Sequence, residues 1–149
     1  MKALLVASPG GHLQQLVWMR PWWEQHERVF VTADVPDARA MLAGERILFA
    51  HHPTNRSVTN LARNLVLARQ VLKRERPDVV VSTGAGVAVP FLWLARRYGA
   101  RAVFVEPYDR VDGPSLSARM VSQFVDAMVL QRPEQQAFHP RGVLLGPVR

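Results

Sequence analysis

The chain of 149 residues contains no cysteine, and its stretch 79–95, which has no charged residue, is not continuously apolar. Without cysteine it has no disulfide, no thiolate metal site and no cysteine nucleophile, which fits a reducing cytoplasm. Polar and small residues and Pro90 interrupt the 79–95 stretch, so we interpret it as strand, loop and helix, not as a membrane span. The apolar run 3–7 is too short for a secretory signal. These absences favour a cytoplasmic location.

Three common site patterns are missing as well. No G-x-G-x-x-G dinucleotide fingerprint follows any expected strand. No G-x-S-x-G elbow surrounds Ser8 or Ser82, although both lie near the ends of expected strands, so a hydrolytic triad is not indicated. His51 and His52 are adjacent and project in different directions, with no acid or further histidine at helical spacing. The sequence therefore predicts neither a bound metal nor an organic cofactor.

The charge balance is strongly positive. The formal net charge is +7, and all but two of the 19 basic residues are arginines. Arginine suits bidentate phosphate recognition, although a GC-rich genome also favours it. We expect an anionic partner, with nucleic acid, an anionic membrane, a nucleotide sugar and a lipid diphosphate as candidates. The scarcity of lysine and the lack of interleaved aromatic and basic strand motifs disfavour nucleic acid.

Length and patterning predict one domain, residues 1–149, with an α/β fold. Short apolar runs alternate with helical stretches, and runs such as 79–81 and 102–105 are continuously apolar, as in strands covered on both faces. This alternation predicts a doubly wound, parallel, Rossmann-like sheet whose ligands bind at the carboxyl ends of the strands. The expected strands are 3–7, 28–32, 46–49, 78–82, 101–105, 126–130 and 143–145.

The best-defined helix is expected over 57–76, where Pro77 ends it. Apolar residues recur at three- and four-residue spacing and predict a core-facing stripe of Val58, Leu61, Leu65, Ala68 and Leu72. Three arginines fall on the opposite side, and they are either ordinary solvated surface or a contact with anionic lipid: Arg56, Arg63 and Arg74.

Three tryptophans, Trp18, Trp22 and Trp23, gather beside Arg20. Pro21 is expected to end or kink the helix that runs from residue 12 to 23. Two interpretations of the cluster remain open. It packs in the core, or it forms an exposed apolar patch that contacts a membrane or a protein partner.

The segment Ser8–His12, with sequence Ser-Pro-Gly-Gly-His, joins the first strand to a helix. Such a join exposes backbone N–H groups at the positive end of the helix dipole, which favours an anion. Glycine allows a diphosphate or a sugar to approach the backbone closely. Ser8, Gly10 and Gly11 are therefore candidate substrate-binding residues, and His12 would touch the bound group. The alternative is a tight turn with a surface histidine.

Two further loops follow strands at the same expected edge. Ser82–Gly86 is a second small-residue turn, so Thr83, Gly84 and Gly86 are candidate substrate contacts; loop-against-loop packing is the alternative. In the segment 106–110, Glu106 is a candidate base or sugar ligand and Arg110 a candidate phosphate ligand. A structural Glu–Arg pair is the alternative for these two.

The chain resembles a known family over most of its length. The resemblance rests on the order of these loops, of the Ser115–Ser117 segment and of the late 129–134 segment along the sequence. The chain is similar to the acceptor-binding subunit of the two-subunit UDP-N-acetylglucosamine transferase of lipid-linked oligosaccharide synthesis, and more closely to its bacterial relatives in capsule and exopolysaccharide assembly. The resemblance implies the N-terminal half of a GT-B glycosyltransferase, related to the N-terminal domain of lipid II synthase.

The same resemblance implies a separate donor-binding partner, with an active site in the cleft between the two proteins. The chain would bind a polyprenyl-diphosphate-linked acceptor on the inner face of the cell membrane, and this acceptor would receive a sugar from a UDP-sugar. His12 is the first candidate for the base that deprotonates the acceptor hydroxyl, and Glu106 is the second. Histidine suits this role because imidazole exchanges protons near neutral pH.

The sequence departs from this family in two places. Eukaryotic members commonly carry an N-terminal anchor, whereas this chain begins with its first strand, so we expect membrane contact through surface residues or a partner. Ala85 also stands where members often have proline. From the residues alone, a non-catalytic nucleotide- or anion-binding module remains the alternative function; it would bind UDP and ignore a lipid acceptor.

Overall fold

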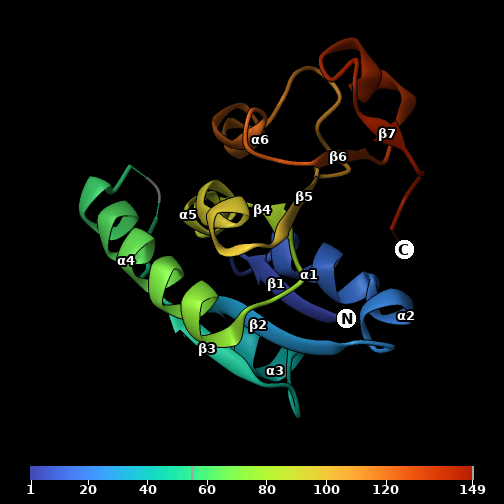
Figure 1. The fold of residues 1–149 in the computed structure, drawn as a ribbon. Helices are drawn as coiled ribbons and strands as arrows, with labels where there is room; N and C mark the ends of the chain where they lie inside the picture. Colours follow the sequence, from blue (N-terminus) through green and yellow to red (C-terminus); the bar gives the residue numbers. More distant parts are fainter. Residues whose placement is uncertain (55, 149) are drawn as a thin grey trace.

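The computed structural model describes residues 1–54 and 56–148, which form a seven-stranded sheet with helices on both faces (Figure 1). The strands are β1 Lys2–Ala7, β2 Glu27–Ala33, β3 Ile47–Ala50, β4 Val79–Gly84, β5 Arg101–Val105, β6 Ala127–Leu130 and β7 Val143–Leu144. The α-helices are α1 Gly11–Trp18, α2 Arg20–Trp23, α3 Pro36–Met41, α4 Val58–Glu75, α5 Ala88–Leu94 and α6 Leu116–Val121. Two 3₁₀ helices are η1 Arg96–Tyr98 and η2 Pro133–Ala137.

The sheet is parallel throughout, in the order β3-β2-β1-β4-β5-β6-β7. All seven predicted strands are present, and the doubly wound Rossmann-like prediction is confirmed. The chain changes direction across the sheet between β1 and β4, which lie side by side. At such a switch point the two loops that leave the strands diverge to opposite faces and open a crevice for ligands.

Both faces of the sheet are covered, which explains the continuously apolar strands. One core cluster lies between the sheet and α4, α5 and α6, with Phe91 and Phe104 fully buried. The other lies beneath α1, α2 and α3, with Leu13 and Phe30 fully buried. The C-terminal segment crosses back to this second side, where Val148 packs on its core (Figure 1).

The core-facing stripe predicted for α4 is partly wrong. The side of Ala68 and Leu72 faces the core as expected, whereas Val58 is 80% exposed and Leu65 also faces solvent. Asn60 and Asn64 are buried instead. They face inward because their side-chain amides satisfy the backbone of the β3–α4 loop: Asn60 donates to the Pro53 carbonyl, and Asn64 bonds both the N–H and the carbonyl of His51.

The tryptophan cluster does not form a single surface patch. Trp23 is 1% exposed, donates its indole N–H to the Leu16 carbonyl at 2.9 Å and meets Phe30 edge to face. The expectation that Trp23 contacts a membrane or partner is therefore wrong. Trp22 is half-buried, whereas Trp18 is 40% exposed on α1. The helix breaks at Met19, as Pro21 predicted.

Candidate functional site

The loop between β1 and α1 places His12 in the first turn of α1. Gly10, the residue before the helix, has a φ of 88°, a conformation that favours glycine. The loop between β4 and α5 lies against it, because the Ser8 N–H donates to the Gly84 carbonyl at 2.8 Å and the Ser8 hydroxyl accepts from the Ala85 N–H. Ser8 therefore joins the two loops, and it lines neither of the cavities described below.

Thr83 fixes the orientation of the His12 ring. The His12 Nδ1 atom lies 2.9 Å from the Thr83 carbonyl oxygen, and the buried Thr83 hydroxyl donates to the His12 carbonyl. A carbonyl oxygen only accepts hydrogen bonds, so Nδ1 carries the proton in this contact. The neutral ring then presents an unprotonated Nε2, which is the form that a general base needs.

The glycines of the β4–α5 loop make room for protein side chains. A Cβ atom on Gly84, which has a φ of 106°, would lie 2.7 Å from His12 Nδ1. A Cβ atom on Gly86 would lie 2.9 Å from the Thr54 hydroxyl. The sequence predicted close approach of a ligand at these positions, with loop-against-loop packing as the alternative. The close neighbours in the structure are the side chains of His12 and Thr54, which agrees with that alternative.

Glu106, at the end of β5, is fully buried. Its carboxylate contacts His139 Nε2 at 2.5 Å and accepts from the Ser115 N–H at 3.4 Å. It lines neither cavity, so its expected role as a second candidate base is incompatible with its position. The contacts instead tie both ends of the segment 106–115, which carries Arg110, to the segment after β6.

Gln135 of η2 is the second support of this loop. Its buried side-chain amide donates to the carbonyls of Pro107 at 2.8 Å and Arg110 at 3.1 Å, and its oxygen accepts from the Gln131 N–H. Sequence reasoning missed Gln135 and His139, because neither belongs to a motif. The only signal was their position after the expected strand 126–130.

The loops after β1, β3, β4 and β5 enclose a cavity of about 600 Å³ beside the N-terminus of α4. Its chemistry is mixed, since Arg56 and Arg110 bring positive charge and Val58, Leu116 and Met120 bring apolar surface. No acidic side chain is found among its described lining residues. The lining comprises His12, Thr54, Arg56, Ser57, Val58, Leu61, Gly84, Ala85, Gly86, Val89, Arg110, Ser115, Leu116, Ser117 and Met120.

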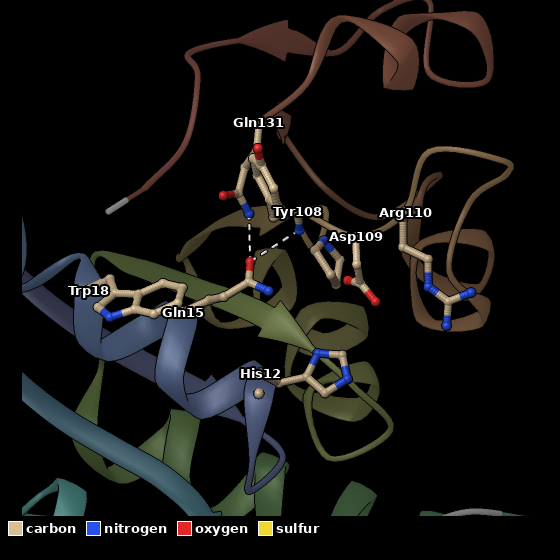
Figure 2. A pocket seen from close by; sticks show the side chains of 9 residues that line it. His12, Gln15, Trp18, Tyr108, Asp109, Arg110 and Gln131 are labelled. Atoms are coloured by element: carbon tan, nitrogen blue, oxygen red, sulfur yellow. Dashed lines mark hydrogen bonds between the residues drawn. The ribbon is translucent and has the colours of Figure 1, made fainter.

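A second cavity of about 350 Å³ lies between α1 and the ends of β5 and β6 (Figure 2). Its lining residues are Gly11, His12, Gln15, Trp18, Pro107, Tyr108, Asp109, Arg110 and Gln131. His12 and Arg110 line both cavities.

The predicted site residues therefore divide into two groups. Gly11, His12, Gly84, Gly86 and Arg110 line the cavities, as a ligand site requires. The others line neither cavity and hold the loops: Ser8, Gly10, Thr83 and Glu106. The sequence indicated Arg56 only as part of a basic stripe with Arg63 and Arg74, as solvated surface or a contact with anionic lipid, and gave no signal for Thr54. Asn55 between them lies outside the described residues.

The described residues contain no group of three metal-ligating side chains of the His, Cys, Asp or Glu type. Nor does the described part of the chain include a helix long and apolar enough to cross a membrane. The Arg56 and Arg110 side chains bring positive charge to the cavities, and backbone N–H groups at the start of α1 also favour an anion.

The sequence matches a known protein family over most of its length. The family described as "Oligosaccharide biosynthesis protein Alg14 like" matches residues 27–148. The chain is a member of this family. The match covers β2 to the C-terminal segment and includes the loops that carry Gly84, Gly86 and Arg110.

The Alg14-like chain is also similar to part of a larger glycosyltransferase. It is 30% identical over 83 residues to the UDP-N-acetylglucosamine–N-acetylmuramyl-(pentapeptide) pyrophosphoryl-undecaprenol N-acetylglucosamine transferase of Alkaliphilus metalliredigens. The match spans 56% of this chain and 22% of that protein. Matched relatives are therefore glycosyltransferases, and the matched part is less than a quarter of their length.

Solved structures share the fold at low sequence identity. MurG of Acinetobacter baumannii superposes with a TM-score of 0.74 at 15% identity, over 90% of this chain and 43% of MurG. UDP-N-acetylglucosamine 2-epimerase of Rickettsia bellii superposes with a TM-score of 0.75 at 13% identity, over 99% of this chain and 45% of the epimerase. The fold is that of the N-terminal domain of GT-B glycosyltransferases, which corresponds to less than half of each solved chain.

Proposed function

We propose that this Alg14-like chain is the acceptor-binding subunit of a glycosyltransferase that moves a sugar from a UDP-sugar to a polyprenyl-diphosphate-linked acceptor in polysaccharide or oligosaccharide biosynthesis. The observation that carries the proposal is the Nδ1 contact of His12 with the Thr83 carbonyl, at the junction of two cavities. In the neutral form of the ring, this contact leaves Nε2 available as a base.

The larger cavity suits a ligand that is both anionic and apolar. Arg56 and Arg110 can each donate charge-assisted hydrogen bonds to diphosphate oxygens. Val58 and Leu116, which are 80% and 71% exposed, extend apolar surface from the same cavity. The isoprenoid part of a lipid diphosphate can bury apolar surface against this side of the cavity, whereas a nucleotide has no such chain. The lining thus favours the lipid acceptor over the nucleotide-binding alternative.

In the proposed reaction, His12 Nε2 takes the proton from an acceptor hydroxyl as its oxygen attacks the anomeric carbon of the donor sugar. A new glycosidic bond forms, the bond from that carbon to the diphosphate of UDP breaks, and UDP leaves with the electron pair. General-base assistance of this kind typically contributes 10²- to 10⁴-fold to a rate. Arginine side chains and N–H groups near the cavities would stabilise the negative charge that develops.

We also propose a donor-binding partner, because the cavities open at the carboxyl edge of the sheet, where a second unit would close a cleft. The proposal also includes peripheral contact with the cytoplasmic face of the membrane. That contact is assigned to the exposed apolar residues Val58 and Leu116 beside Arg56, in place of the buried Trp23.

Equilibrium binding to polyprenyl diphosphate in detergent micelles tests the acceptor assignment. We expect the wild-type chain to bind this lipid, and Arg110→Ala to weaken binding at least about 10-fold through loss of a charged hydrogen bond. Arg119→Ala, an exposed arginine on α6 that lines neither cavity, serves as the matched control and should bind as the wild type does. Tight binding of UDP without binding of the lipid would contradict the proposal and favour the nucleotide-binding module.

A further inference from the structure

The smaller cavity is separate from the diphosphate site proposed above, yet it shares His12 and Arg110 with it. Its volume of about 350 Å³ lies within the range of small-molecule sites. A group bound in one cavity and a group bound in the other would therefore meet at His12. The residues that line only the smaller cavity determine which group fits there.

Gln15 on α1 presents a hydrogen-bond donor to this cavity. Its side-chain oxygen accepts from Gln131 Nε2 at 2.7 Å and from the Tyr108 N–H at 3.2 Å. Gln131 is itself held, because its amide also donates to the Glu106 carbonyl and its oxygen accepts from the Val148 N–H. With its oxygen engaged twice, Gln15 turns its amide nitrogen toward the cavity (Figure 2).

Asp109 and Trp18 complete a varied lining. The Asp109 side chain is exposed and reaches the cavity between Tyr108 and Arg110 (Figure 2), where an ionised carboxylate only accepts hydrogen bonds. Trp18, 40% exposed, lies six residues along α1 from His12 and contributes a flat apolar ring. The cavity thus offers a donor, an acceptor and an aromatic surface in one small space.

A pyranose ring matches this combination. Its hydroxyl groups both donate and accept hydrogen bonds around the rim, and its C–H face packs on an aromatic ring. The order of groups along the acceptor also indicates a sugar in the smaller cavity. If the diphosphate lies in the larger cavity, the group attached to it on the side of His12 and Arg110 is the first sugar of the acceptor.

We propose that the smaller cavity is the subsite for the acceptor sugar that is attached to the diphosphate, with Asp109 and Gln15 recognising its hydroxyl groups. This inference rests on the proposed function and adds the residues that select the acceptor. It also places the accepting hydroxyl between the sugar subsite and His12, which is where a base must reach it.

Binding measurements with the full chain in detergent micelles test the subsite. The probes are polyprenyl diphosphate and the same lipid diphosphate linked to glucose, galactose or N-acetylglucosamine. For the wild type we expect at least one sugar-linked lipid to bind about 10-fold more tightly than the sugar-free lipid. Gln15→Glu keeps the acceptor atoms for Gln131 and Tyr108 but removes the donor, and Asp109→Asn removes the carboxylate. Each substitution should abolish most of this difference and leave binding of sugar-free lipid unchanged.

Asp112→Asn is the matched control, because Asp112 is an exposed carboxylate in the same loop that lines neither cavity. It should retain the preference for the sugar-linked lipid. Equal binding of sugar-linked and sugar-free lipids by the wild type would overturn the subsite while the acceptor assignment stands. An identical response of Asp109→Asn and Asp112→Asn would overturn the role of Asp109. Failure of the wild type to bind any of the four lipids would contradict the proposed function itself, and the subsite with it.

Discussion

His12 Nδ1 and the Thr83 carbonyl oxygen lie 2.9 Å apart, although the two residues are separated by 71 positions in the sequence. The contact joins the first turn of α1 to the end of β4 at the switch point of the sheet. It fixes both the orientation of the imidazole and the nitrogen that holds its proton. The proposed chemistry therefore depends on a backbone carbonyl, which side-chain substitution of Thr83 does not remove.

Replacing His12 tests its role as base. We expect His12→Ala to lower transfer by the chain and its partner at least about 100-fold, because the general base is lost, while the complex still assembles. His26→Ala provides the control and should retain activity, because His26 is a half-buried histidine after α2 that lines neither cavity. Turnover rates and size-exclusion chromatography measure the two effects. Near-normal turnover of His12→Ala would exclude His12 as the base.

Gly84→Ala tests the position of the ring without removing it. The added Cβ would lie 2.7 Å from His12 Nδ1, so the imidazole must shift and the contact with the Thr83 carbonyl is disturbed. We expect the kcat of transfer to fall at least about 10-fold, since about 1 Å of misplacement is costly in catalysis. Gly99→Ala has a similar positive φ of 80° and no atom within 4 Å of its Cβ, so it reports backbone strain alone. Equal kcat values for the two variants would contradict the account.

Gln135→Leu tests the support of the loop that carries Arg110. The substitution removes the donors to the Pro107 and Arg110 carbonyls and leaves buried acceptors unpaired. We expect a loss of about 1–3 kcal/mol in the free energy of unfolding, together with a higher KM for the lipid acceptor. Chemical denaturation and steady-state kinetics measure these effects. Gln136→Leu, at an exposed neighbouring position, should change neither quantity.

Glu75, at the end of α4, is expected to make the free energy of unfolding depend on pH. Hydrogen bonds from Arg46 and, more weakly, from Lys2 outweigh the opposing effect of burial and lower the pKa of Glu75 from 4.5 to about 2. Because the folded state holds this carboxylate ionised, the stabilisation is present above pH 4.5 and is lost as the pH falls from 4.5 towards 2.

The matching experiment compares thermal unfolding of the wild type and Glu75→Gln between pH 7 and pH 2.5. We expect the variant to be less stable at pH 7 by on the order of 2 kcal/mol, a value moderated by the solvent exposure of Arg46. The difference between the two proteins should shrink as the pH falls below 4.5. A difference that stays constant over this range would show that Glu75 stabilises the fold by another route.

The fold could be predicted closely, because it follows from local patterns. Continuously apolar runs such as 79–81 indicate buried parallel strands, and each lies in the strand that was expected. The α4 face was harder to predict. Hydropathy favours Val58 and Leu65 as core residues, whereas long-range hydrogen bonds to the backbone of the β3–α4 loop bring Asn60 and Asn64 inward.

The candidate site could be predicted only where a motif marks it. Small residues after a strand indicated Gly84 and Gly86, and a polar residue in a helix's first turn indicated His12. Glu106 illustrates the limit, because the sequence left a base, a sugar ligand and a structural pair with Arg110 open, whereas the structure pairs its carboxylate with His139. Gln15 and Gln131, 116 positions apart, have no local signal at all.

The most direct test of the account is sugar transfer from a panel of radiolabelled UDP-sugars to polyprenyl-diphosphate-linked acceptors in membranes, with this chain alone, with a candidate donor-binding partner alone and with both. We expect transfer only when both proteins are present, and we expect His12→Ala to abolish it. Transfer by the partner alone, or the absence of transfer by any combination together with binding of UDP by this chain, would contradict the account.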